Sequence, residues 1–81
     1  MNWTHIGNSN YEARNDRSYA TVHWSPDGSW YARAEVETDT IRVTASRKAV
    51  GLDSLKLAQI WATAACLQLQ RIAERLGEVE Q

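Results

Sequence analysis

The chain has 81 residues, enough for one small domain with a single core. Nine basic and ten acidic side chains give a formal charge of −1, which lacks the basic excess of a protein that depends on phosphate contacts. The single cysteine, Cys66, excludes an internal disulfide and fits a reducing compartment. Residues 1–5 show no signal-peptide pattern, and no stretch approaches the roughly 20 apolar residues of a membrane span. We therefore expect a cytoplasmic protein that does not enter a membrane.

Residues 1–17 are polar, rich in asparagine and without a clear hydrophobic period. This composition is typical of an arm that is either disordered or laid on the domain through Trp3, Ile6 and Tyr11. We assign no secondary structure to this arm.

Three runs with a period of two follow, at 18–24, 30–37 and 41–47. Apolar and polar side chains alternate in each run, as in a strand with one buried face. Between the first two, residues 25–28 read Ser-Pro-Asp-Gly, in which Pro presets a turn and Gly accepts a positive φ. Short connections between adjacent runs predict a three-stranded antiparallel meander. Trp30 begins an inward-facing row, so we expect it to be buried.

The last third of the chain has the spacing of one long helix. Asp53 or Ser54 can cap its start, and Gly77 is a natural stop. Its apolar stripe comprises Leu55, Ala58, Ala62, Ala65, Leu69, Ile72 and Leu76. The predicted fold is α+β, a three-stranded antiparallel meander packed on this helix (βββα). The predicted parts are a polar arm at 1–17, the βββα domain at 18–77 and an acidic tail at 78–81.

A second apolar row on the same helix is formed by Leu57, Ile60, Ala64 and Leu67. A helix that lies on a sheet usually has one apolar stripe and one polar face. The second row therefore predicts a cover, which is either the N-terminal arm or another copy of the chain. In the second case the row is the interface of a homodimer.

The inventory of catalytic groups is small. Cys66 lies among apolar helix neighbours, where a free cysteine is usually a small core residue, and the two histidines have no zinc-ligand spacing. The sequence contains no phosphate-binding glycine loop and no serine elbow. We expect a binding protein that is not an enzyme and has no metal or cofactor.

The sheet face turned away from the helix is the candidate binding surface. Arg33 and Arg42 occupy adjacent predicted strands on this face, where two guanidinium groups can address one target. Glu35 and Glu37 share the face; they argue against a track for DNA phosphates and suit a basic protein partner. The candidate ligand-binding residues are Thr21, His23, Tyr31, Arg33, Arg42 and Thr44.

The stretch Val22-His23-Trp24-Ser25-Pro26-Asp27-Gly28-Ser29-Trp30-Tyr31-Ala32-Arg33 resembles a known hairpin. It is similar to the first hairpin of the plant Apetala-type (ethylene-response-factor) DNA-binding domain and its relatives in phage homing endonucleases and integrases. The resemblance covers residues 19–69 and includes Trp61, Ala64 and Ala65 in the helix. It implies a three-stranded sheet that enters the major groove, with DNA contacts from His23, Trp24, Arg33 and Arg42. The glycine that those domains carry after the third strand is missing here.

Two functions follow from these observations. The first is a small DNA-binding regulator, from a phage or mobile element, that reads DNA with its sheet. The alternative is a protein-binding regulator, such as a phage-type inhibitor of a host system or an antitoxin-like partner. The expected partner is accordingly DNA or a host protein.

Overall fold

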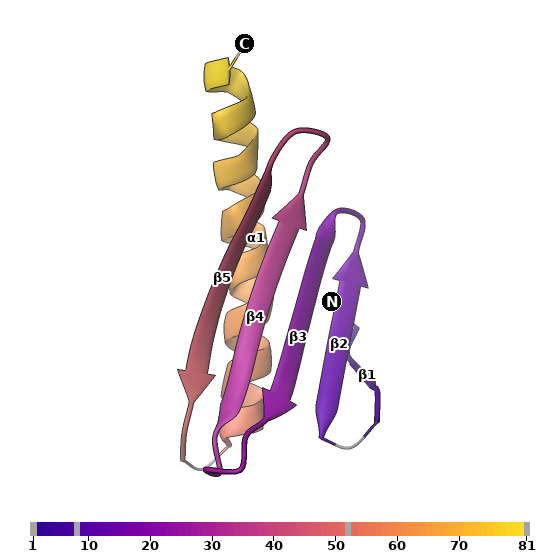
Figure 1. Ribbon diagram of the computed structural model, residues 1–81, viewed down its shortest axis with the longest axis vertical. Helices are drawn as coiled ribbons and strands as arrows, with labels where there is room; N and C mark the ends of the chain where they lie inside the picture. Colours follow the sequence, from indigo (N-terminus) through magenta and orange to yellow (C-terminus); the bar gives the residue numbers. More distant parts are fainter. Residues whose placement is uncertain (1, 8, 52, 81) are drawn as a thin grey trace.

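A computed structural model describes residues 2–7, 9–51 and 53–80, and it contains one antiparallel sheet and one C-terminal helix (Figure 1). The sheet has five strands, which lie side by side in chain order. Its strands are β1 (Thr4–His5), β2 (Asn10–Asn15), β3 (Ser18–Trp24), β4 (Trp30–Glu37) and β5 (Arg42–Ala49). The helix, α1, spans Ser54–Glu80. The fold is thus α+β with a meandering sheet.

The prediction of a three-stranded sheet is wrong, because part of the expected arm forms β1 and β2. β2 pairs with β3 along its whole length, from Asn10 opposite His23 to Asn15 opposite Ser18. Only Ala13 of the six β2 residues is buried. Backbone pairing with β3, more than burial of apolar side chains, therefore holds this strand in place, which explains why its sequence looks like that of an arm.

The strands expected at 18–24 and 30–37 have these bounds in the structure, and the third begins one residue late, at Arg42. The turn between β3 and β4 is closed by a 2.9 Å hydrogen bond from Gly28 N to Ser25 O. Gly28 has a φ of 86°, a conformation that a residue with a Cβ rarely adopts. The turn therefore forms as its sequence predicts.

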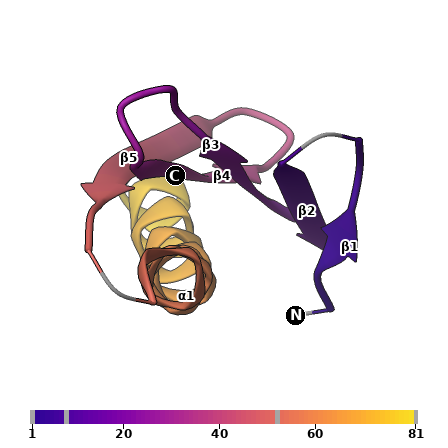
Figure 2. The same ribbon diagram turned by 90° about the horizontal axis from the view of Figure 1, so that it is seen from below.

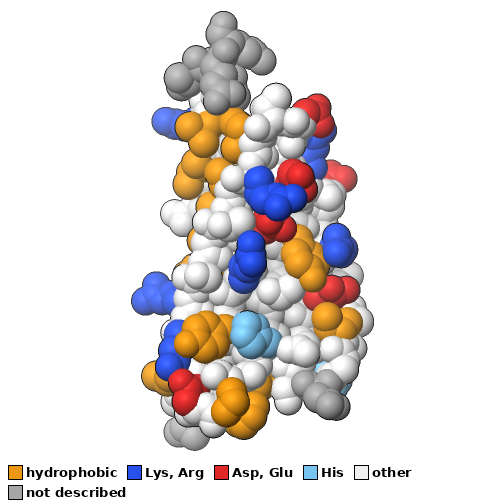
Figure 3. All heavy atoms as spheres, viewed as in Figure 1, with side chains coloured by type: hydrophobic (Ala, Val, Ile, Leu, Met, Phe, Trp, Pro, Cys, Tyr) orange, Lys and Arg blue, Asp and Glu red, His pale blue; other side chains and the backbone are white. Residues whose placement is uncertain are grey.

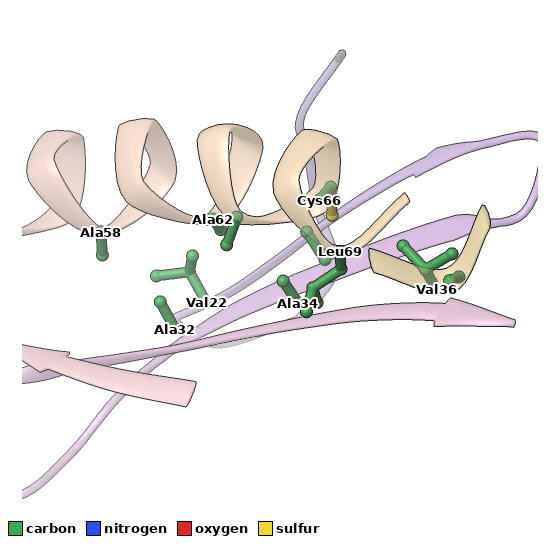
Figure 4. Close-up of a cluster of buried hydrophobic side chains, with 11 residues drawn as sticks. Val22, Ala32, Ala34, Val36, Ala58, Ala62, Cys66 and Leu69 are labelled. Atoms are coloured by element: carbon green, nitrogen blue, oxygen red, sulfur yellow. The ribbon is translucent and has the colours of Figure 1, made fainter. Parts of the chain in front are cut away.

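α1 covers one face of the sheet, over β3, β4 and β5 (Figure 2). The β1–β2 pair lies beyond the helix and curls toward the same side (Figure 2). Ala58 and Ala62 of α1 point toward Val22 and Ala32 of the sheet (Figure 4). Such small side chains let the helix lie close to the strands.

Trp30 faces the helix side, as expected, but it is only half-buried. It stands at the first position of β4, where it pairs with Trp24 on one side and Ala49 on the other. Its ring packs against the margin of the core and lies 5.9 Å from the ring of Tyr11. The expectation of full burial is wrong because the residue lies at the end of the sheet.

The helix begins where the sequence predicts but continues further. The Asp53 carbonyl accepts a 3.0 Å hydrogen bond from Leu57 N, and Ser54 is the first helical residue. The helix passes through Gly77 to Glu80, since a glycine inside a helix costs only about 1 kcal/mol relative to alanine. Its last turns extend beyond the sheet (Figure 1). Within the described residues, no helix has the combination of length and apolar character that a membrane crossing requires.

Candidate functional site

The sheet face opposite α1, which we call the open face, carries mostly polar and charged side chains. The strand register places residues from β2, β3, β4 and β5 on it, because cross-strand partners share a face. These residues are Asn10, Glu12, Arg14, Tyr19, Thr21, His23, Tyr31, Arg33, Glu35, Glu37, Arg42, Thr44, Ser46 and Lys48. Figure 3 looks onto this face, where basic and acidic side chains alternate and a histidine lies near apolar groups.

The two arginines expected at the centre of the binding surface are close together and paired with glutamates. Arg42 Nε lies 3.4 Å from Glu35 Oε1, and Arg42 Nη2 lies 3.3 Å from Glu37 Oε1. Arg33 Nη2 lies 3.9 Å from the same Glu35 oxygen. Glu35 is the least exposed member, with 21% of its side chain accessible against about 60% for each arginine. One carboxylate thus holds two guanidinium groups side by side at the surface.

An aromatic corner lies at the end of the open face near the β3–β4 turn. The rings of His23 and Tyr31 stack with their centroids 5.5 Å apart and their planes inclined by 13°. Lys48 Nζ lies 5.7 Å from the Tyr31 ring and 2.6 Å from Asp27 Oδ2. The hydrogen bond from Lys48, together with hydrogen bonds from Ser29, holds the pKa of Asp27 far below its ordinary value. The same hydrogen bond between Lys48 and Asp27 raises the pKa of Lys48. The corner therefore presents a stacked aromatic pair beside a fixed ion pair.

β2 contributes three residues that the sequence reasoning left out of the site. The Arg14 guanidinium lies 4.2 Å from the centroid of the Tyr19 ring, and the Tyr19 hydroxyl donates a 2.9 Å hydrogen bond to Glu12 Oε2. Burial, followed by the hydrogen bond to Glu12, raises the pKa of Tyr19. The third residue is Asn10, opposite His23. The alternation of Glu12 and Arg14 with Tyr11 and Ala13 was the available signal for this strand.

A polar hollow of about 610 Å³ opens at the far end of this face, beside the β2–β3 and β4–β5 turns. It is lined by charged and hydroxyl groups from several strands, namely Arg14, Asp16, Arg17, Ser18, Tyr19, Glu35, Glu37, Thr38 and Asp39. Charges of both signs face it. The hollow can therefore accept polar side chains of either charge.

The structure brings most of the candidate binding residues onto one surface. Thr21 lies opposite Arg33, and Thr44 lies opposite Glu35, so both hydroxyl groups flank the arginine cluster. Trp24 is the exception. It pairs with Trp30 on the side of the sheet that faces the helix, where it is 46% exposed. Trp24 therefore does not join the other candidate DNA contacts on a common face.

Residues that could support catalysis are dispersed. In the part of the chain that the structure describes, no three His, Cys, Asp or Glu side chains lie close enough to hold a metal ion. Cys66 is buried, and burial raises the pKa of its thiol. His5 stacks on Tyr11 on the helix side of the sheet, away from His23 on the open face.

The second apolar row of the helix is exposed. Leu57, Ile60 and Leu67 have exposed fractions of 53%, 57% and 61%, and Ala64 between them is also exposed. Trp3, from the segment before β1, lines a groove along one side of this row. Of the two expected covers, the N-terminal segment thus contacts only part of the row and leaves most of it accessible.

The chain matches no family model, no curated protein and no solved structure. The resemblance of residues 19–69 to Apetala-type domains thus stays a prediction.

Proposed function

We propose that the chain is a non-catalytic protein-binding regulator that recognises a partner protein with its open face. The observation that carries the proposal is the balance of charge on this face. Arg14, Arg33, Arg42 and Lys48 stand against Glu12, Glu35, Glu37 and, at the adjoining turn, Asp27.

This balance weighs against DNA binding by the sheet. A DNA-binding surface gains most of its affinity from cations that replace the counterions of phosphates. Here Arg33 and Arg42 already contact Glu35, so a phosphate would have to displace a carboxylate or lie beside it. Repulsion from Glu35 and Glu37 would offset the gain from the two arginines. The DNA-binding alternative is therefore the weaker one.

A protein partner fits the same features. Arginine and tyrosine are enriched among the residues that contribute most to protein interfaces. The His23–Tyr31 stack offers a rigid apolar plane, and the Arg33–Glu35–Arg42 cluster offers donors and an acceptor in a fixed arrangement. The complementary surface has both acidic and basic side chains around an apolar contact for Tyr31. Such matching of charges provides specificity more than affinity.

The experiment compares capture of a partner with binding of nucleic acid. The immobilised chain is incubated with nuclease-treated extract of the cells that encode it, and random-sequence duplex DNA is titrated separately at about 50 and 200 mM salt. Arg33→Ala/Arg42→Ala is the test variant. Lys56→Ala/Arg75→Ala is the matched control, because it removes the same charge from exposed positions on α1.

We expect a discrete protein that is retained after nuclease treatment, is kept by the control and is lost by the test variant. We expect weak DNA binding that is equal in the two variants. DNA binding that decreases steeply with salt and depends on Arg33 and Arg42 would overturn the proposal in favour of DNA recognition. Equal capture by both variants would move the binding site off the open face.

A further inference from the structure

The core of the domain contains few large side chains. Eight of the twelve buried hydrophobic residues in the described part of the chain are alanines, and the largest fully buried side chains are Val22, Val36 and Ser29. A domain of this size has little stability to spare, and alanine contributes less burial than leucine or isoleucine. The large aliphatic side chains of α1 instead lie largely outside this core. Most of the large apolar side chains of α1 are therefore exposed at the surface.

The exposed apolar row of α1 has the spacing of a helix–helix interface. Leu57, Ile60, Ala64 and Leu67 are separated by three, four and three residues, which is the a/d pattern of two successive heptads. The row lies on the side of α1 away from the sheet, since Ala58, Ala62, Ala65 and Leu69 form the opposite, buried side. Two heptads are too short for an independent coiled coil. They suffice as a contact between helices that are each held by a sheet.

The row has a groove on each side. One, of about 410 Å³, lies between the row and Trp3; the other, of about 420 Å³, lies between the row and the end of β5, beside Trp61. Ile60 borders both grooves, so it stands on a ridge between them. A second copy of this surface provides a ridge and grooves of the same dimensions. A two-fold symmetric interface brings these same patches together, so the ridge of each copy can meet a groove of the other.

We propose that this helix face binds a second copy of the chain, with the two α1 helices antiparallel. In this register Leu57 faces Leu67 of the second copy, and Ile60 faces Ala64, so each large side chain of the central layers meets a small one. Both open faces then point outward from a sheet–helix–helix–sheet assembly. The dimer presents two recognition surfaces on opposite sides.

The direction of the helices follows from charge. Arg71 takes the next position of the heptad row at one end, and Asp53, the residue directly before α1, stands at the other end; both are exposed. The α1 axis separates them by roughly 27 Å at the helical rise per residue, too far for them to pair with each other. In an antiparallel pair, Asp53 of one copy faces Arg71 of the other, twice by symmetry. A parallel pair would place Asp53 against Asp53 and Arg71 against Arg71, so repulsion disfavours it.

The test measures self-association by sedimentation velocity over a concentration series, with far-ultraviolet circular dichroism to check folding. Leu57→Glu/Leu67→Glu places carboxylates in the interface and is expected to sediment as a monomer. Thr44→Glu/Ser46→Glu, with the same charge change on exposed positions of the open face, is expected to remain a dimer. A wild-type monomer at high micromolar concentration overturns the proposal, as does a dimer that survives the interface substitutions.

A charge series tests the direction and uses only exposed positions. Arg71→Glu is expected to weaken association about ten-fold, whereas Arg71→Lys leaves it unchanged. Asp53→Asn, which suits the left-handed φ of 58° at this position, weakens the wild-type dimer but strengthens the Arg71→Glu dimer. In a parallel dimer Asp53→Asn would strengthen both. Strengthening of both dimers, or no response in either, overturns the antiparallel arrangement.

Discussion

Lys48 Nζ lies 2.6 Å from Asp27 Oδ2, and this contact ties the end of β5 to the turn between β3 and β4. The two residues are 21 positions apart in the chain. Because Lys48 also lies over the Tyr31 ring, the ion pair fixes one side of the aromatic corner.

This ion pair predicts a dependence of stability on pH. The pKa of Asp27 in the folded chain lies below its ordinary value of 3.8, so the folded state favours the ionised carboxylate. The stabilisation is therefore present above pH 3.8 and is lost as the pH falls through the lower pKa of the folded state.

Thermal unfolding of the wild type and Lys48→Ala should differ by a few degrees at most at pH 7, and the difference should shrink below about pH 4. High salt should reduce it, because both groups are exposed. Lys56→Ala, an exposed lysine on α1, is the control and should show no such pH dependence. A difference that grows on acidification would contradict the direction of the Asp27 shift.

Leu69→Ala tests the packing of helix on sheet. Leu69, 8% exposed, is the largest buried side chain among the described residues of α1, and its neighbours are too small to fill the space it would leave. The substitution should lower the free energy of unfolding by about 2–5 kcal/mol, measured by urea denaturation. Leu76→Ala is the matched control, since Leu76 is 41% exposed, and it should cost much less. Equal costs would show that the helix is packed on another face.

Trp30→Ala should destabilise the domain less than removal of a fully buried tryptophan. Trp30 is half-buried and contacts Tyr11 at the end of the sheet, so we expect a loss of about 2 kcal/mol instead of the 3–5 kcal/mol typical of core aromatic residues. Chemical denaturation monitored by circular dichroism measures the loss. An unchanged free energy of unfolding would show that Trp30 does not stabilise the margin of the core.

The arginine cluster should contribute to binding and little to folding. Arg33 and Arg42 are each about 60% exposed, and exposed ion pairs contribute only about 0–1 kcal/mol. Arg33→Ala/Arg42→Ala should therefore keep nearly the wild-type melting temperature while losing the captured partner. A large fall in melting temperature would instead show that the two arginines stabilise the fold through their contacts with Glu35.

Hydrophobic periodicity in the sequence predicted the strands whose apolar side chains face the helix. In β3 and β4 small apolar residues such as Val22 and Ala34 alternate with polar ones, so bounds and inward faces could be read directly. β2 was not predicted because only Ala13 of this strand is buried. Its pairing with β3 depends on backbone groups that every residue carries. The continuation of α1 through Gly77 was not predicted from the sequence. A single glycine lowers helix stability only slightly, and the helix-forming residues around it compensate.

The candidate site was predictable to a similar degree. Alternation alone placed His23, Tyr31, Arg33 and Arg42 on one face, as the register has them. The contributions of Glu12 and Arg14 depended on the missed strand. Pairing of Arg33 and Arg42 with Glu35 depends on side-chain conformations, which a period-two pattern does not specify.

Site-specific photo-crosslinking in cells tests whether the open face recognises a protein. A photoreactive residue replaces Thr44 on the open face or, as the control, Gln68 on α1; both positions are exposed. We expect one discrete product from position 44 that resists nuclease, is destroyed by protease and is absent from position 68. A product from position 44 that nuclease removes, or the same product from both positions, would show that the open face does not recognise a protein.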